Sequence, residues 1–391
     1  MTTTTTSSRR ALLDALTARS LDAAAWSPAL IDAVVAEALQ ASEIERLTHV
    51  ASRADAASGL ARVANAADAA AQPTRVLSGW QASLTVEVLQ RLTNADIVAR
   101  VFKGAPLAAW LHGDATVRNS CDIDVLLRPA DVQRAISVLM ADGWSLPFNL
   151  RAEHFDAALL RRYREVPLSN FGGTFSLDLH WRLTSDWNER VVDEAALLSP
   201  SAETVMVAGR ALPWFAAADV WCVQLSHVVT SDWRGLKAWV DLAWASDRLG
   251  VDDWAAVAAR LDTHAAFGAP AVAAVAARVL HAVFARSVPA QIATPVLRAN
   301  VARRVEAVAA AAARHLLGED EANGSASEQS AIGLLRGTAI SRESALARAR
   351  AMTTRLTTPA LDDVIDAHGE KRTTAGAALE MAARRWRSYR G

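Results

Sequence analysis

The chain has 391 residues, of which 52% are hydrophobic, enough to build two or three packed units of a globular protein. Its 42 acidic and 41 basic residues give a formal net charge of −1, which excludes a global field that would draw it onto nucleic acid or an anionic membrane. Cys121 and Cys222 form no C-x-x-C pair, so neither a thiolate zinc cage nor a disulfide framework is expected. No apolar run of secretory length follows the first arginines, so we expect a cytoplasmic protein.

The amino-terminal part of the chain reads as helical. Residues 11–93 are rich in Ala, Leu, Val and Arg at helical spacing, and no alternating strand pattern interrupts them. Gln72, Pro73 and Thr74 give a loop signal within this stretch. We therefore predict a helical amino-terminal region over residues 1–94, with a loop at 72–74.

The pattern changes at Ala95, where short apolar strands begin to alternate with helices. The first predicted strand, at 96–104, ends at the Gly104 turn, and a helix from Pro106 follows at 106–111. A second strand at 121–127 leads to a helix at 130–142, which Gly143 ends, and a third strand follows at 174–183. This alternation predicts a small mixed sheet with helices against it. The fold class is therefore α+β, with a core at residues 95–185 flanked by helical regions.

Beyond the core the sequence becomes helical again. We expect a helical region over 186–317 that packs on the core, and within it an apolar stretch at 265–286. That stretch is interrupted by Pro270, Arg278 and His281, which favours a buried helix over a membrane span. The polar run at 318–330 predicts a linker or loop, followed by a carboxy-terminal helical tail at 331–391.

Two aspartates stand at the start of the second predicted strand. In Asp122-Ile123-Asp124 the strand period of two sends both carboxylates to one face. Such a pair suits Mg²⁺, which prefers oxygen ligands and binds through one or two carboxylates together with substrate phosphates. An isolated D-x-D is more often a pair of solvated strand-end residues, so the context decides.

The context is a third carboxylate within the third predicted strand. Phe175, Leu177, Leu179 and Trp181 face one side of this strand, while Ser176, Asp178 and His180 face the other. A buried charge needs a cation or hydrogen-bond donors, and metal shared with Asp122 and Asp124 would supply one. The alternative is an ion pair between Asp178 and an arginine such as Arg118. We expect a structural role for His180.

Three segments of the chain together resemble a known family. They are Val101-Phe102-Lys103-Gly104-Ala105, then the run from Arg118 to Leu127 that contains Ser120, then Leu177-Asp178-Leu179-His180-Trp181. A further match is Leu225-Ser226-His227 with the segment from Trp233 to Leu242. Over about residues 78–260 the chain is similar to the uncharacterised bacterial nucleotidyltransferases of the polymerase-beta-like superfamily.

The resemblance implies a site in which Asp122 and Asp124 bind Mg²⁺, or Mn²⁺ in its place, and Asp178 acts as ligand or general base. In that superfamily a Gly-Ser pair after the first strand opens a helix that holds the triphosphate, whereas here Ala105 follows Gly104. The expected nucleotide-binding set is Lys103, Gly104, Ala105, Arg118, Ser120 and Lys237. Backbone amides at the helix start, with Lys103 or Arg118, can still bind phosphate.

Two residues of the downstream match have structural alternatives. Lys237 could simply pair with Asp241 one helical turn further on. For His227, on an apolar helix, a hydrogen-bonded core histidine is the favoured interpretation over a base.

These features predict a Mg²⁺-dependent enzyme that moves an NMP group from an NTP, with ATP as the first expectation, to a hydroxyl on a small molecule, peptide or protein. Two other hypotheses remain. One is a degenerate nucleotide-binding or protein-interaction module, motivated by Ala105, and the other is a protein that regulates a partner through its helical regions. Nucleic acid and membranes are not expected partners.

Overall fold

The computed structural model describes residues 2–17, 23, 26–54, 60–120, 122–147, 150–185 and 188–319. The expected linker therefore lies outside the described residues from residue 320 on. The expected tail at 331–391 lies outside them entirely.

Four helices form the amino-terminal part of the described chain: α1 Thr2–Leu16, α2 Pro28–Gln40, α3 Ile44–Arg53 and α4 Leu60–Asn94. The start of α2 has clear sequence determinants. The Ser27 hydroxyl accepts a hydrogen bond from the Leu30 amide, and Pro28 occupies the first turn, where its missing N–H costs nothing.

The predicted loop at 72–74 is wrong, because Pro73 lies inside α4. A proline in a helix interior removes one backbone hydrogen bond and costs about 3 kcal/mol or more. Here α3 packs along α4, a tertiary contact that can offset this cost, and the helix continues through the proline.

The central sheet has four strands: β1 Ala99–Val101, β2 Asp122–Leu127, β3 Glu165–Asn170 and β4 Phe175–His180. Their order is β1-β2-β4-β3, with β2 parallel to β4 and each edge strand antiparallel to its neighbour. The sheet is mixed and helices flank it, which confirms the predicted α+β class.

Short helices connect the strands of this sheet. They are α5 Gly104–His112, the 3-10 turn η3 Pro129–Asp131, α6 Val132–Ala141, η5 Ala152–His154, α7 Ala157–Arg162 and η6 Phe171–Gly173. Gly143 follows α6 with a φ of +91°, a left-handed conformation that glycine adopts without strain. The helix ends where the sequence predicts.

Three strands were not predicted. Strand β3 carries Pro167 and polar residues, and it lies at the sheet edge, where a proline is tolerated. Strands β5 Thr204–Val207 and β6 Arg210–Pro213 form a separate antiparallel hairpin inside the segment expected to be helical. Four-residue strands are too short for their alternation to stand out in the sequence.

The rest of the described chain is helical: α8 Glu194–Leu197, α9 Ala217–Thr230, α10 Leu236–Arg248, α11 Val251–Thr263, η7 Ala265–Phe267, α12 Ala269–Phe284, α13 Ala290–Ala293 and α14 Ala299–Leu316. Most of α12 is buried, as the apolar stretch at 265–286 predicts. Of the described helices, none is both long and apolar enough to cross a membrane.

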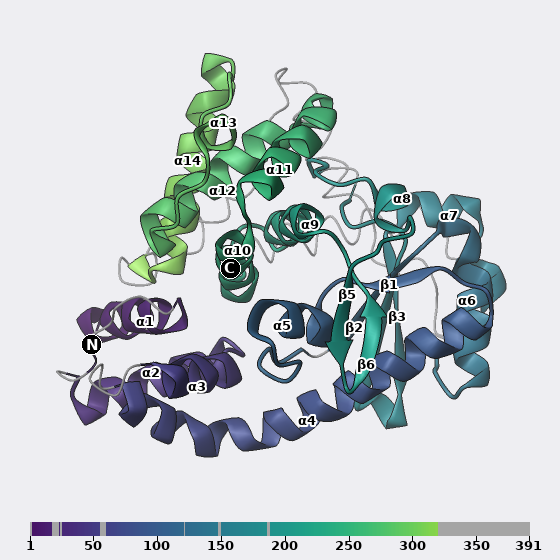
Figure 1. Cartoon of the computed structure of the whole chain (residues 1–391), viewed down its shortest axis with the longest axis horizontal. Helices are drawn as coiled ribbons and strands as arrows, with labels where there is room; N and C mark the ends of the chain where they lie inside the picture. Colours follow the sequence, from purple (N-terminus) through teal and green to yellow (C-terminus); the bar gives the residue numbers. More distant parts are fainter. Residues whose placement is uncertain are drawn as a thin grey trace, which may run out of the picture.

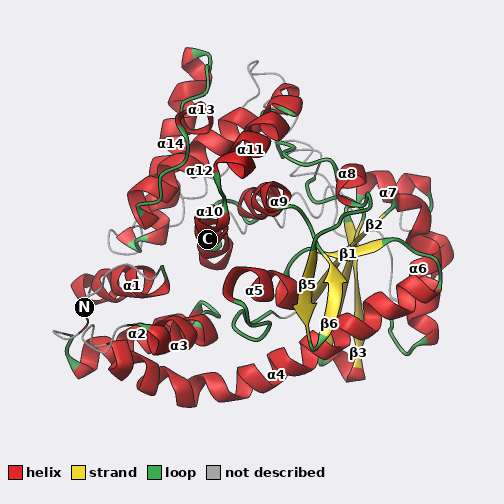
Figure 2. Cartoon of the chain, viewed as in Figure 1, coloured by secondary structure: helices red, strands yellow, loops and turns green. Residues whose placement is uncertain are grey.

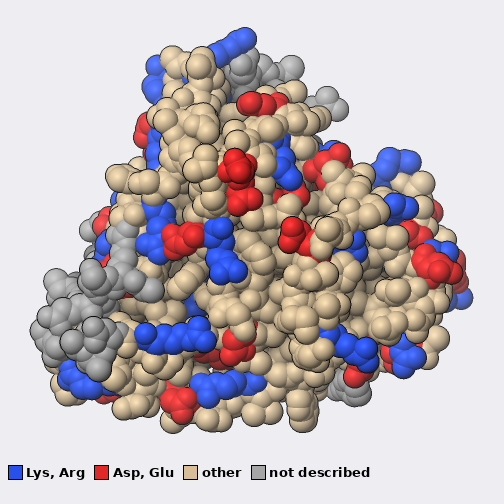
Figure 3. All heavy atoms as spheres, viewed as in Figure 1, with Lys and Arg blue, Asp and Glu red and all other residues tan. Residues whose placement is uncertain are grey.

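Helix α4 is the longest element and links the two sides of the molecule. It runs along the lower edge of Figure 1, from beside α2 and α3 to the sheet. Figure 2 shows the strands gathered on one side of an otherwise helical protein. On the surface shown in Figure 3, basic and acidic groups are intermingled, with no large area of one sign.

Candidate metal and nucleotide site

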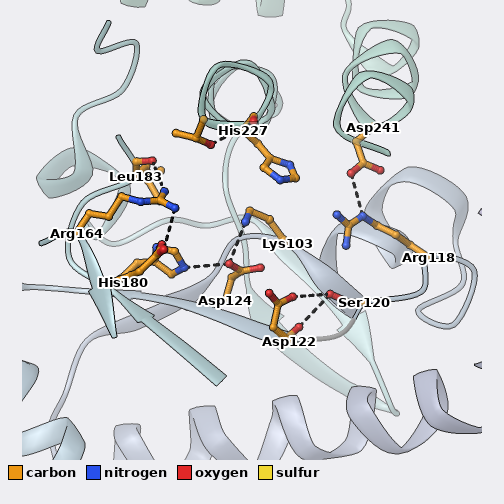
Figure 4. Close-up of polar contacts among 12 residues, drawn as sticks. Lys103, Arg118, Ser120, Asp122, Asp124, Arg164, His180, Leu183, His227 and Asp241 are labelled. Carbon is orange, nitrogen blue, oxygen red and sulfur yellow. Dashed lines mark hydrogen bonds and ion pairs between the residues drawn. The ribbon is translucent and has the colours of Figure 1, made fainter. Parts of the chain in front are cut away.

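The three predicted carboxylates lie on adjacent strands. Asp124 of β2 is directly opposite Asp178 of β4, and Asp122 is opposite Ser176. Asp124 is 2% exposed, while Asp122 and Asp178 are half-buried. Asp124, Asp178 and His180 each offer one potential metal-ligand atom, and these three atoms lie within 4.8 Å of one another. In Figure 4 Asp122 and Asp124 point from the strands toward α9 and α10.

Two cationic groups already contact Asp124. The Lys103 ammonium and the His180 Nε2 lie 2.9 and 3.0 Å from the same oxygen, Oδ1 (Figure 4). Burial alone would raise the pKa of Asp124, but Lys103 and His180 hold it far below its usual range. Asp124 is therefore ionised under all ordinary conditions.

His180 lies between two carboxylates. Its Nδ1 forms an ion pair with Glu165 Oε2 at 3.0 Å while its Nε2 contacts Asp124. Burial opposes the charged form, yet these two carboxylates raise the pKa of His180. With Nε2 against Asp124 and Nδ1 against Glu165, His180 of β4 joins carboxylates of both neighbouring strands, β2 and β3.

Asp122 and Asp178 lack such partners. Among the described residues neither carboxylate forms an ion pair, and the carboxylate of Asp122 accepts one hydrogen bond, from the Ser120 hydroxyl at 3.1 Å. Burial raises the pKa of Asp178 to about 6, and the carboxylates of Asp122 and Asp124 add to the rise. The ligand atoms that converge come from Asp124, Asp178 and His180, and Asp122 offers a further carboxylate at the start of β2. Carboxylate oxygens are the ligands that a hard divalent ion such as Mg²⁺ prefers, so the residues present fit a metal.

Helix α5 begins beside these carboxylates. Gly104 opens it with a φ of +62°, and Lys103 precedes it as the N-cap residue. Ala105 is buried and has no hydroxyl. A Cβ placed on Gly104 would lie 3.7 Å from the Ser120 Oγ, so a hydroxyl from a different segment stands near the helix start.

Arg118 faces a buried ionic cluster instead of Asp178. Its Nε donates to Asp241 Oδ2 at 2.9 Å, and Arg46 of α3 donates to the other oxygen of Asp241 at 2.5 Å. Arg46 also forms an ion pair with Glu43 at 2.9 Å. Arg46 and Asp241 are 0% exposed. The predicted alternative of an Arg118–Asp178 pair does not form.

Lys237 also lacks the partner that its sequence spacing suggests. Both oxygens of Asp241 accept hydrogen bonds from arginines, so Asp241 forms no ion pair with Lys237. Lys237 forms no ion pair with any other described residue either. Burial, together with the charge of Arg118, lowers the pKa of Lys237 to about 8.

His227 of α9 points toward Lys103 in Figure 4. Its Nδ1 is buried and has no hydrogen-bond partner among the described residues, so the hydrogen bond expected of a core histidine is not made at this nitrogen. Burial lowers the pKa of His227 well below its usual range, and Lys103 and Arg118 add to the effect. The imidazole is therefore neutral.

Three residues near the site had no recognisable signal in the sequence. Gln81 of α4 donates its side-chain amide to the Asp122 carbonyl at 2.8 Å, and so fixes the start of β2. Glu165 lies on the unpredicted β3, and Arg46 reaches Asp241 from 195 positions away in the chain. Only tertiary structure brings these residues to the site.

Comparison with known proteins relates the chain to one family. A family model described as an uncharacterised nucleotidyltransferase matches residues 27–283, more than half of the chain. Neither a curated protein nor a solved structure matches.

Proposed function

Because the chain belongs to the uncharacterised nucleotidyltransferase family, we propose that it moves an NMP group from an NTP to an acceptor hydroxyl in a metal-dependent reaction. We further propose that its core is of the polymerase-beta-like kind. The site would comprise Asp122, Asp124 and Asp178 together with Lys103, Gly104, Ala105, Arg118, Ser120 and Lys237.

The charge distribution around the site carries this proposal. On the strand face, Asp122 and Asp178 have no cation partner among the described residues. On the side of α3 and α10, Arg46, Arg118 and Lys237 stand among the carboxylates of Glu43, Glu45 and Asp241, and Lys237 has no ion-pair partner among the described residues. Carboxylates without an ion-pair partner on one side and an unpaired ammonium on the other suit a divalent metal bound to a polyphosphate.

The metal would be held by Asp122, Asp124 and Asp178, where it would neutralise negative charge that develops at the α-phosphate. Asp178 has a pKa of about 6, so it is ionised at neutral pH and can take the proton of the acceptor hydroxyl. The acceptor oxygen then bonds to the α-phosphorus, the bond to the β-phosphate oxygen breaks, and pyrophosphate leaves with that electron pair.

The triphosphate would lie at the start of α5. The free amides of a helix amino terminus and the positive end of its dipole favour an anion there. Ser120 would supply the hydroxyl that Ala105 lacks, and Lys103, Arg118 and Lys237 would supply positive charge. Mg²⁺ and ATP are the first combination to test, with a small molecule, peptide or protein as acceptor.

Isothermal calorimetry with ATP, GTP, CTP and UTP, with and without Mg²⁺, tests this proposal. Wild type is compared with the Asp122→Asn, Asp124→Asn double variant. Asp68→Asn is the control, because it removes an exposed carboxylate of α4 that pairs with Arg75. We expect metal-dependent binding of at least one nucleotide, lost in the double variant and kept in the control. Failure of wild type to bind any nucleotide would refute the proposal.

One observation favours a second candidate function. Ala105 is buried at the helix start and offers no hydroxyl to the phosphates, which fits a protein that binds a nucleotide without using it. Pyrophosphate release during incubation with cell extract as the acceptor source separates the two candidates. Metal-dependent binding with no release from any extract would favour the binding module, or a regulator of a partner protein.

A further inference from the structure

Lys103 pairs with a carboxylate that the proposed metal would use. Its ammonium lies 2.9 Å from Asp124 Oδ1, and that oxygen also accepts from His180. A Mg²⁺ ion bound to a carboxylate oxygen sits about 2.0–2.1 Å from it. The ion and the ammonium would then be neighbours on one carboxylate, and two positive charges that close repel each other strongly at a partly buried site.

The two cations on Asp124 differ in their freedom to leave. His180 is 2% exposed and is held from its other side by Glu165. The Lys103 side chain is 15% exposed, and among the described residues its ammonium makes one ion pair, the one to Asp124. The ammonium also lies over the face of the Phe102 ring, 5.1 Å from the ring centre, and His227 points toward it from α9. Lys103 is therefore the cation that can move.

A nearby position exists for the displaced ammonium. Lys103 is the N-cap residue of α5, so its flexible side chain starts at the helix terminus where phosphate would bind. An ammonium that leaves Asp124 can therefore pair with a phosphate oxygen of the substrate without any movement of the backbone.

We propose that Lys103 is a resident counter-ion of Asp124 that keeps divalent metal off this carboxylate until a nucleotide phosphate accepts the ammonium. Metal and nucleotide then bind together, and metal alone binds weakly. This inference rests on the proposed function, because it needs a nucleotide at the start of α5.

Binding of Mn²⁺, measured by the loss of the free-ion signal in electron paramagnetic resonance, tests the inference without relying on activity. The full chain is titrated with Mn²⁺ alone and then with the α,β-methylene analogue of ATP present, which cannot transfer its nucleotidyl group. The variants are Lys103→Met, which removes the charge, and Lys103→Arg, which keeps it. Arg91→Met is the control, since Arg91 is 58% exposed and pairs with Asp142.

Without nucleotide, we expect Lys103→Met to bind Mn²⁺ about tenfold or more tightly than wild type, and Lys103→Arg and Arg91→Met to match wild type. The analogue should tighten Mn²⁺ binding in wild type, and should do so much less in Lys103→Met. Circular dichroism confirms that each variant is folded.

The outcomes separate this inference from the proposed function. If wild type binds Mn²⁺ with the analogue, but Lys103→Met binds Mn²⁺ alone no more tightly than wild type, the counter-ion role is wrong and the function stands. If Lys103→Met gains Mn²⁺ affinity but no variant binds the analogue, the proposed function fails, while the competition between Lys103 and the metal for Asp124 is supported. If no variant binds Mn²⁺ at all, both are refuted.

Discussion

At the scale of single residues, the site depends on local conformations as much as on charges. Gly104 turns the chain from β1 into α5 with a positive φ, next to Ser120 and to the backbone of Asp122. A Cβ at this position would make only ordinary contacts, at 3.7 Å or more. Any cost of a side chain therefore comes from the backbone conformation.

Replacement of Gly104 by Ala should lower the free energy of unfolding by about 1–2 kcal/mol, because an L-residue is strained in the left-handed region. Urea denaturation measures this loss. Gly79→Ala is a matched control, since Gly79 lies inside α4 with open space around it and Ala favours a helix there by up to about 1 kcal/mol. Equal effects of the two substitutions would contradict the conformational argument.

Lys237 should make nucleotide binding depend on pH. The pKa of Lys237 in the free protein is lowered to about 8, so its positive charge is present at pH 7 and is lost as the pH rises through that value. A bound phosphate raises this pKa, and affinity should fall by up to about tenfold per pH unit between the two pKa values. Calorimetry at pH 7 and pH 9 shows the fall in wild type.

The Lys237→Arg variant is the control for this prediction, because arginine keeps its charge throughout that range. Its nucleotide affinity should be the same at pH 7 and pH 9. An equal loss of affinity in wild type and Lys237→Arg would place the titrating group elsewhere.

At the scale of elements, α3, α10 and the segment before β2 meet at Asp241. Its two oxygens each accept one arginine, Arg46 from α3 and Arg118 from the segment before β2. Helix α3 thus helps to fix the position of Arg118, although it lies far from the sheet in the sequence. Through Arg46, the helical amino-terminal region therefore contacts the same carboxylate that holds Arg118.

Arg46→Met should lower the free energy of unfolding by about 3–5 kcal/mol, since it leaves Glu43 without its ion-pair partner and deprives one Asp241 oxygen of its donor. Thermal and urea denaturation measure the change. Arg10→Met is the comparison, because the pair of Arg10 with Asp14 is more exposed and its loss should cost less than about 1 kcal/mol. Similar losses in both variants would argue against a tight buried cluster.

How far the sequence could predict this fold depends on the range of the interactions involved. Strands β2 and β4 show the period of two in their own residues, so the face that carries Asp124 and Asp178 could be predicted. Strand β3 could not, since Pro167 is acceptable only because that strand lies at an edge. The continuity of α4 through Pro73 depends on packing with α3, which no local pattern encodes.

The candidate site follows the same rule. The local motifs led to the three carboxylates and to Lys103, whereas the pairing of Arg118 with Asp241, and the lack of an ion pair for Lys237 among the described residues, could not be deduced. Asp241 is one turn from Lys237 in α10, yet it pairs with two arginines from other segments. The assigned roles of these residues remain proposals, while their positions are properties of the fold.

At the scale of the whole molecule, all side chains of the proposed site lie between residues 103 and 237. The described residues that hold these side chains in place lie between 43 and 241. A chain ended after Glu319 should therefore bind the metal and nucleotide with unchanged affinity in calorimetry. The intact chain is the reference, and circular dichroism checks that the shortened chain folds. A loss of binding in a folded shortened chain would assign residues 320–391 a part in the site.

Helix α4 joins distant parts of the molecule as one continuous element. Its 35 residues span about 52 Å, with α3 packed along it and Gln81 holding the Asp122 carbonyl. One residue inserted between Ala71 and Gln81 would turn the distal half by about 100° and shift it by about 1.5 Å. During evolution, insertions into this helix should therefore be rarer than insertions into the loops around the sheet.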